Sequence, residues 1–157
     1  MKTYLVIVGR TEKRWLMTGI DEYLTRISKY IPFYTIVIED IKSRAKMPES
    51  IIKIKEGELI LKKIDSNDVM ILLDEKGKTL SSRDFADFIQ KHANLGTRNI
   101  FFVVGGAYGF SNAVYDRCNY MISLSQMTFS HQMARLIFAE QLYRALTIIN
   151  NEPYHHG

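Results

Sequence analysis

A glycine-rich segment, Gly105-Gly106-Ala107-Tyr108-Gly109, follows an apolar run and precedes a short helical segment. Such a turn can cradle a phosphate group, because the unpaired N–H groups at a helix N-terminus favour anions. The spacing differs from G-x-G-x-x-G, and the lysine and hydroxyl pair of a P-loop is missing. Glycines that simply permit a turn with positive φ explain the same residues. Spacing alone therefore leaves a ligand turn and a structural turn both open.

The chain also carries an aromatic and basic tail, Pro153-Tyr154-His155-His156, that no hydrophobic core explains. Stacking on a base, contact with a phosphate and acceptance of a proton are all open to Tyr154 and His155. A disordered tail is the alternative. Metal binding by the histidine pair is disfavoured, because no carboxylate or cysteine lies at ligand spacing.

The elements that must position these residues alternate regularly along the chain. Apolar and β-branched runs predict strands over 3–8, 33–38, 69–73 and 99–104, and a short final strand that ends at Leu124. Helical periodicity predicts helices over 13–30, 49–64, 81–95, 111–118 and 131–149. In the first of these helices Trp15 and Tyr23 are expected in the core, and residues 75–78 are expected to form a tight loop.

This order predicts one α/β domain over residues 1–157, a mostly parallel sheet with helices on both faces. Ligands bind such sheets beyond the carboxyl ends of the strands. Three strand ends are chemically unusual: Leu73-Asp74, Gly105-Gly106, and the polar turn from Leu124 to Phe129. We expect the functional site where these three ends meet.

The last helix is apolar around most of its circumference, with Ser130 as its expected N-cap. A helix of this kind must be covered on more than one side. In a small protein this favours the sheet on one side and a second subunit on the other, so we expect a dimer.

Composition excludes several classes of protein. A hydrophobic content of 46% is ordinary for a globular chain, and no apolar run approaches the ~20 residues of a membrane span. We therefore expect a cytoplasmic protein. The single cysteine, Cys118, excludes an intrachain disulfide and is more simply a buried thiol than a nucleophile. The net charge of +4 permits a polyanionic partner without requiring one.

Four segments together are far more specific than any one of them. They are residues 103–109 with the glycine turn, residues 124–135, residues 140–145, and the Pro153-Tyr154-His155 tail. This combination resembles the RlmH branch of the SPOUT, or α/β-knot, methyltransferases over essentially the whole chain. Where that family often has proline or serine followed by an acidic residue or asparagine, this chain has Ala107 and Tyr108.

The resemblance implies a deep trefoil knot in the C-terminal half and an obligate homodimer. It implies S-adenosyl-L-methionine (AdoMet) as cofactor and no metal. The implied reaction is methylation at N3 of a pseudouridine in a stem-loop of 23S rRNA, preferentially within assembled 70S ribosomes. The resemblance assigns AdoMet contacts to the same three strand ends, at Leu73, Gly105, Leu124, Ser125, Gln126, Met127, Thr128 and Phe129.

The resemblance also suggests roles for four side chains near the substrate. Arg135 could stabilise a developing uracil anion or hold a phosphate, and an interface salt bridge is the alternative. His131 could contact the substrate or cap its helix. Tyr154 and His155 are the remaining catalytic and substrate-binding candidates, whereas Glu140 and Arg144 are expected to form a structural i, i+4 pair.

Two other functions remain compatible with these residues. One is a ribosome-binding or RNA-binding protein of the same fold that has lost its activity. The other is a methyltransferase that acts on a different RNA uridine. AdoMet affinity separates the first from an active enzyme, and only the substrate separates the second.

Overall fold

The computed structural model describes all 157 residues, and strands and helices alternate as expected. The strands are β1 (Lys2–Val8), β2 (Phe33–Ile38), β3 (Val69–Thr79), β4 (Asn99–Val104) and β5 (Tyr120–Ser123). The helices are α1 (Arg14–Ile27), α2 (Glu49–Leu61), α3 (Ser82–Asn94), α4 (Asn112–Arg117) and α5 (His131–Ile149), with a short 3-10 turn, η1 (Arg44–Lys46).

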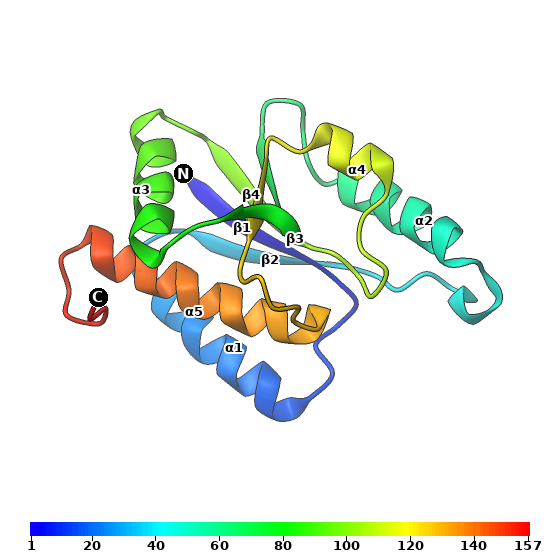
Figure 1. The fold of residues 1–157 in the computed structure, drawn as a ribbon, viewed down its shortest axis with the longest axis horizontal. Coiled ribbons are helices and arrows are strands. Elements are labelled where there is room, and N and C mark those ends of the chain that lie inside the picture. Colours follow the sequence, from blue (N-terminus) through cyan, green and yellow to red (C-terminus); the bar gives the residue numbers. More distant parts are fainter.

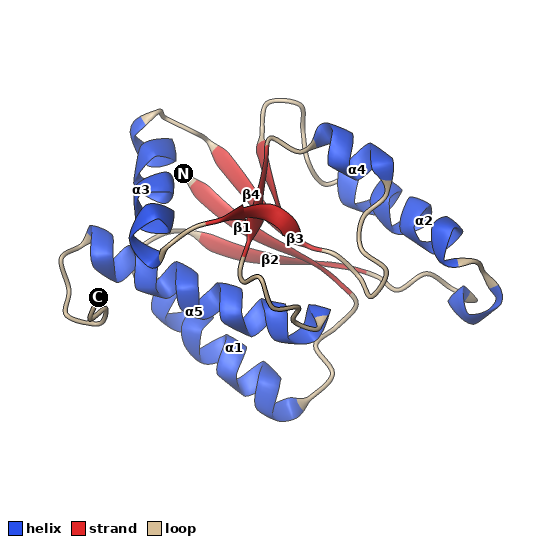
Figure 2. Cartoon of the chain, viewed as in Figure 1, coloured by secondary structure: helices blue, strands red, loops and turns tan.

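The strands form one parallel sheet in the order β2-β1-β4-β3-β5. Helices α1, α3 and α5 cover one face, while α2 and α4 cover the other (Figures 1 and 2). Side chains alternate between the two faces along each strand, so Leu5 and Ile7 join one core and Val6 and Val8 join the other. The predicted α/β architecture is confirmed.

Three serines begin helices as their sequence positions predict. The hydroxyl oxygens of Ser81, Ser111 and Ser130 accept hydrogen bonds from backbone N–H groups three residues later. These caps satisfy donors that the first helical turn leaves unpaired. Each therefore sets where its helix begins after the preceding strand or loop.

The expectation that Trp15 lies in the core is wrong, because its side chain is 62% exposed. Trp15 lies in the first turn of α1, while the face of this helix that meets the sheet is formed by Leu16, Ile20 and Ile27. In the first turn, therefore, Leu16 and not Trp15 is the buried residue. Tyr23 is half-buried and packs against Tyr143 of α5.

The expected tight loop over residues 75–78 is also wrong, because β3 continues through it to Thr79. Leu73 and Lys78 both pair with Ile122 of β5. Between them, a Cβ on Gly77 would lie 2.6 Å from the backbone carbon of Met121. This continuation of β3 therefore lies directly against the backbone of β5. The implied knot stays a prediction.

Helix α5 packs between α1 and α3 on its face of the sheet (Figure 1). Phe138, Leu142 and Leu146 of α5 enter the core, whereas Met133 and Ile137 are half-buried. No helix is long and apolar enough to cross a membrane.

Candidate functional site

A cavity of about 750 Å³ opens at the carboxyl edge of the sheet, where β3, β4 and β5 end. The three strand ends singled out in the sequence meet here, as expected. Seven of the eight predicted cofactor contacts line this cavity, and the exception is Gln126. The seven are Leu73, Gly105, Leu124, Ser125, Met127, Thr128 and Phe129.

The glycine segment forms a closed β-turn above β4. The Gly109 N–H donates to the Gly106 carbonyl at 3.1 Å, and Gly109 has a φ of 82°. A Cβ on Gly105 would lie 3.1 Å from the ring of Phe110, and one on Gly106 would lie 2.7 Å from Glu56 Oε1. A side chain at either position would therefore displace Phe110 or Glu56, and the same turn forms one wall of the cavity.

The opposite wall, residues 124–130, is held in shape by its own hydroxyl groups. The Ser123 hydroxyl donates to the Ser125 carbonyl at 2.7 Å, and the Ser125 hydroxyl accepts from the Met127 N–H at 3.0 Å. The Thr128 hydroxyl donates to Glu75 at 2.6 Å, which ties this wall to the continuation of β3. The wall is therefore organised before any ligand arrives.

Residues 73–76 of β3 also line the cavity. Among them, Asp74 already has hydrogen-bond partners within the chain. Its carboxylate accepts hydrogen bonds from the Tyr115 hydroxyl and from the Lys76 N–H. Burial and the hydrogen bond to Asp74 raise the pKa of Tyr115. This phenol therefore stays protonated at neutral pH and acts as a donor.

Glu56 of α2 lies directly beneath the glycine turn and was not singled out as a site residue in the sequence. It is 2% exposed, and its Oε1 atom has no hydrogen-bond partner. Burial raises the pKa of Glu56, although the nearby Arg44 opposes this shift. Helical spacing could have found it, because Glu56 lies four residues from both Ile52 and Ile60 and so shares the buried face of α2.

His131 lines the cavity from the first turn of α5, as the sequence predicts. Burial lowers the pKa of His131, and the cation of Arg135 lowers it further. The imidazole is therefore neutral at physiological pH, so it can accept or donate a hydrogen bond.

Arg135 does not reach the cavity wall. Its side chain is buried, and its guanidinium donates to the Val8 carbonyl at 2.7 Å and to the Thr11 hydroxyl at 3.0 Å. Burial lowers the pKa of Arg135, and no carboxylate lies within ion-pair distance. These contacts make Arg135 an anchor between α5 and the segment that follows β1, so its predicted catalytic and substrate-binding roles stay predictions.

The tail folds back on the last turns of α5 instead of extending into solvent. The Tyr154 hydroxyl donates to Glu140 at 3.0 Å, and Arg144 donates to His155 Nδ1 at 3.1 Å. Arg144 and Glu140 form an ion pair at 2.6 Å, and the Arg144 guanidinium also lies over the Tyr154 ring. Glu140 and Arg144, which were expected only to pair with each other, thus also hold Tyr154 and His155. The sequence analysis did not predict these contacts.

Within one chain the tail and the cavity are far apart. His131 begins α5 and Arg144 lies thirteen residues later, which corresponds to about 20 Å along the helix axis. A single copy therefore brings His131 together with the predicted cofactor contacts, and it keeps Tyr154 and His155 in a separate cluster.

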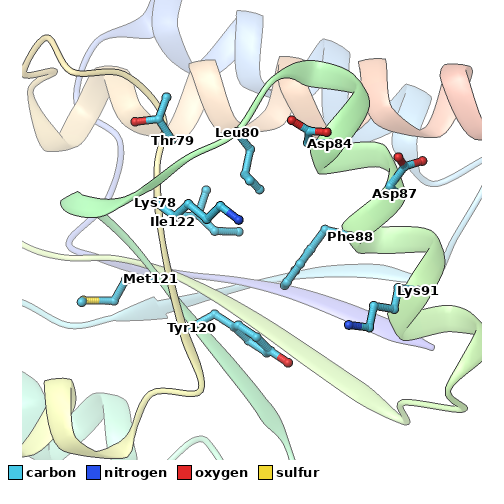
Figure 3. A pocket seen from close by; sticks show the side chains of 10 residues that line it. All are labelled: Lys78, Thr79, Leu80, Asp84, Asp87, Phe88, Lys91, Tyr120, Met121 and Ile122. Carbon is cyan, nitrogen blue, oxygen red and sulfur yellow. The ribbon is translucent and has the colours of Figure 1, made fainter.

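A second cavity, of about 490 Å³, lies between α3 and β5 (Figure 3). Phe88 of α3 and Tyr120 of β5 both line it and pack edge to face, with ring centroids 5.1 Å apart. Lys78 and Thr79 border this cavity, whereas the preceding residues of the same strand, from Leu73 to Lys76, border the first. None of the predicted site residues lies here. No group of three or more His, Cys, Asp or Glu side chains in the chain is placed to hold a metal ion.

Comparisons with known proteins identify similar chains. The model of the family described as "Predicted SPOUT methyltransferase" matches residues 1–155. The chain is 51% identical to a "Ribosomal RNA large subunit methyltransferase H" of Parabacteroides distasonis and 54% identical to one of Flavobacterium psychrophilum. Each alignment covers 99% of both chains.

Two solved structures share the fold at low sequence identity. A probable methyltransferase of Bordetella pertussis matches with a TM-score of 0.55 and 12% identity, over 92% of this chain and 95% of that one. A probable methylase family protein of Haemophilus influenzae matches with a TM-score of 0.53 and 10% identity, over 95% of this chain and 66% of that one.

Proposed function

Because the chain belongs to the SPOUT methyltransferase family, we propose that it methylates 23S rRNA at N3 of a pseudouridine, with AdoMet as the methyl donor. We further propose that it acts on assembled 70S ribosomes. Relatives at about half identity over the whole chain carry the name of a methyltransferase of large-subunit ribosomal RNA. The observation that carries the proposal is the cavity at the three strand ends, where seven of eight expected cofactor contacts meet.

The residues around this cavity fit AdoMet. Leu73 and Leu124 offer apolar walls to a flat adenine, and the glycine turn lets backbone N–H and C=O groups approach closely. Asp74 and Glu75 place carboxylates on the cavity wall, which suits a ligand with sulfonium and ammonium cations. When bound, AdoMet supplies an activated methyl group, so the chain's own residues need mainly to align the acceptor.

The tail residues are suited to donating hydrogen bonds, not to accepting the N3 proton. Burial and the hydrogen bond to Glu140 raise the pKa of Tyr154, so its phenol is protonated at neutral pH. Arginine can only donate, so His155 Nδ1 must be the acceptor of its contact with Arg144, which leaves Nε2–H free to donate. Arg144 and His155 thus form a donor set for the uracil oxygens, which gain negative charge when N3 loses its proton.

The distance between tail and cavity calls for a second copy of the chain. Two α5 helices packed antiparallel across a two-fold axis would place the tail of one subunit beside the cavity of the other. Met127, which is 78% exposed, and the half-buried Met133 and Ile137 provide apolar surface for this contact. We propose a homodimer in which each active site combines the cavity of one subunit with the tail of its partner.

The test is transfer of labelled methyl from AdoMet to 70S ribosomes that lack this modification, with free 50S subunits in parallel. The labelled nucleotide is then mapped. Label at N3 of one pseudouridine, mainly on 70S particles, supports the proposal. Label at another uridine would mean that the proposed substrate is wrong. Absence of both label and AdoMet binding would favour an inactive ribosome-binding protein.

A further inference from the structure

The tip of the glycine turn presents an aromatic side chain to solvent. The bridge between Gly106 and Gly109 closes the turn, so Ala107 and Tyr108 are its two tip residues. Tyr108 is 39% exposed and lies on the wall of the large cavity. A closed β-turn restricts the backbone on both sides of the ring, so Tyr108 is presented in a restricted orientation.

An arginine supports one side of this ring. The Arg44 guanidinium lies 5.8 Å from the centroid of Tyr108, within the range of a cation–π contact. Arg44 in turn pairs with Asp40 at 3.3 Å, and a Cβ on Gly9 would lie 2.9 Å from the Asp40 carboxylate. The segments that follow β1 and β2 thus hold Arg44 in place behind the ring.

Further cations lie near Arg44 in sequence and on the wall of the cavity. Lys42 and Lys46 flank Arg44 in sequence and are exposed, and Lys53 of α2 lines the same cavity. An aromatic ring among lysines and arginines is the combination that proteins use for unpaired nucleotides, since bases stack on the ring and phosphates meet the cations.

We propose that Tyr108 is a stacking platform for an unpaired nucleobase of the RNA substrate, with Arg44 supporting the ring and Lys42 and Lys46 facing the adjoining phosphates. The proposal rests on the proposed function and adds a substrate contact to the same site. It places an RNA base beside the mouth of the cofactor cavity, at a position that also limits which nucleotide can reach the cavity.

The alternative occupant of this platform is the adenine of AdoMet. Charge at the turn tip favours RNA, because Arg44 lies over the ring and AdoMet carries two cationic groups and only one carboxylate, whereas Asp74 and Glu75, which suit AdoMet, follow Leu73 on the cavity wall. The cofactor contacts expected at Leu73, Gly105 and Leu124 come from the strand ends, while Tyr108 projects from the turn tip.

The experiment compares Tyr108→Ala with Tyr108→Phe, which keeps the aromatic ring. KM for undermethylated 70S ribosomes, kcat and the Kd for AdoMet are measured for each. Loss of one stacked base corresponds to a rise of about 5- to 100-fold in KM for Tyr108→Ala. Tyr108→Phe should stay close to wild type, and the Kd for AdoMet should not change in either variant. Tyr34→Ala is the matched control, because Tyr34 is also exposed, at 47%, but lies on edge strand β2.

Two results would overturn the proposal. One is an unchanged KM for Tyr108→Ala. The other is a rise in the Kd for AdoMet in parallel with KM, which would assign the ring to the cofactor. If wild-type protein transfers no methyl group to ribosomes, the proposed function fails separately. The same variants are then compared by their affinity for a single-stranded RNA oligonucleotide, and equal affinities of Tyr108→Ala and wild type would refute the platform.

Discussion

Glu56 is a buried carboxyl group that the proposed reaction does not use. Its titration should make the free energy of unfolding depend on pH. Its pKa in the folded protein is raised by burial, so folding favours the protonated form. This group's contribution to stability is fully present below the pKa of an unfolded glutamate. It is lost as pH rises through the higher folded pKa.

Glu56→Gln should therefore stabilise the protein at pH 8 and leave its stability nearly unchanged at about pH 4. Thermal unfolding across this pH range measures the difference. Glu58→Gln on the same helix is the control, because Glu58 is exposed. An equal gain in stability at pH 4 and at pH 8 would contradict the raised pKa of Glu56 in the folded protein.

Arg135 allows the anchoring and catalytic roles to be separated by experiment. Arg135→Ala removes the hydrogen bonds to Val8 and Thr11 and leaves a void, so we expect the free energy of unfolding to fall by about 2–4 kcal/mol. Urea unfolding measures this change. If Arg135→Ala instead keeps the stability of wild type and loses methyl transfer, the result would support the catalytic role expected for Arg135.

The continuation of β3 is the element that the sequence did not reveal. Residues 75–78 look like a loop because Glu, Lys and Gly are poor strand formers. The strand resumes its pairing with β5 at Lys78, more than forty residues earlier in the chain than its partner Ile122, and local propensity contains no information about that contact. By contrast, Ser81 and Ser130 and the apolar runs of β3 and β4 are local signals, and the structure confirms them.

Gly77 is the position at which this contact should be most sensitive. A methyl group there would lie 2.6–2.8 Å from backbone atoms of Met121 and Ile122, which cannot move independently of β5. Gly77→Ala should therefore lower the free energy of unfolding by about 1–3 kcal/mol. Chemical denaturation measures the loss, with the exposed neighbour Lys76→Ala as control. An unchanged denaturation midpoint for Gly77→Ala would mean that β3 can move away from β5 at this position at little cost.

The place of the site could be predicted from the sequence because parallel strands end at the same edge of a sheet, whereas the individual AdoMet contacts came from the family resemblance and stay predictions. The contacts of Tyr154 and His155 with Glu140 and Arg144 could not be predicted, because local patterns do not show how the tail folds back on α5. The exposure of Trp15 was missed for a related reason: a helical stripe alone does not state which of its flanks meets the sheet.

The proposed composite site predicts how two inactive proteins should behave when mixed. Gly105→Val should block the cavity, since a side chain there meets Phe110, and Arg144→Ala should release Tyr154 and His155 from α5. After the two proteins are unfolded and refolded together, half of the dimers should combine one variant of each kind. Each mixed dimer then keeps one intact site, so activity should return to about a quarter of wild type.

The same mixture distinguishes the composite site from a site within one chain. If one chain supplied both cavity and tail, no subunit in the mixture would be intact, and methyl transfer would stay at background. Each variant refolded alone serves as the control. Size-exclusion chromatography with light scattering confirms that mixed dimers have formed.

The segment from Leu73 to Lys78 pairs with Ile122 at both of its ends, and its middle lies against the β5 backbone. This arrangement has a mechanical consequence. A proteolytic machine that pulls the C-terminus would draw α5 and then β5 against residues 73–78. Several hydrogen-bonded pairs between β3 and β5 would have to break together before the chain unfolds. The C-terminal tail is therefore a poor handle for such a machine.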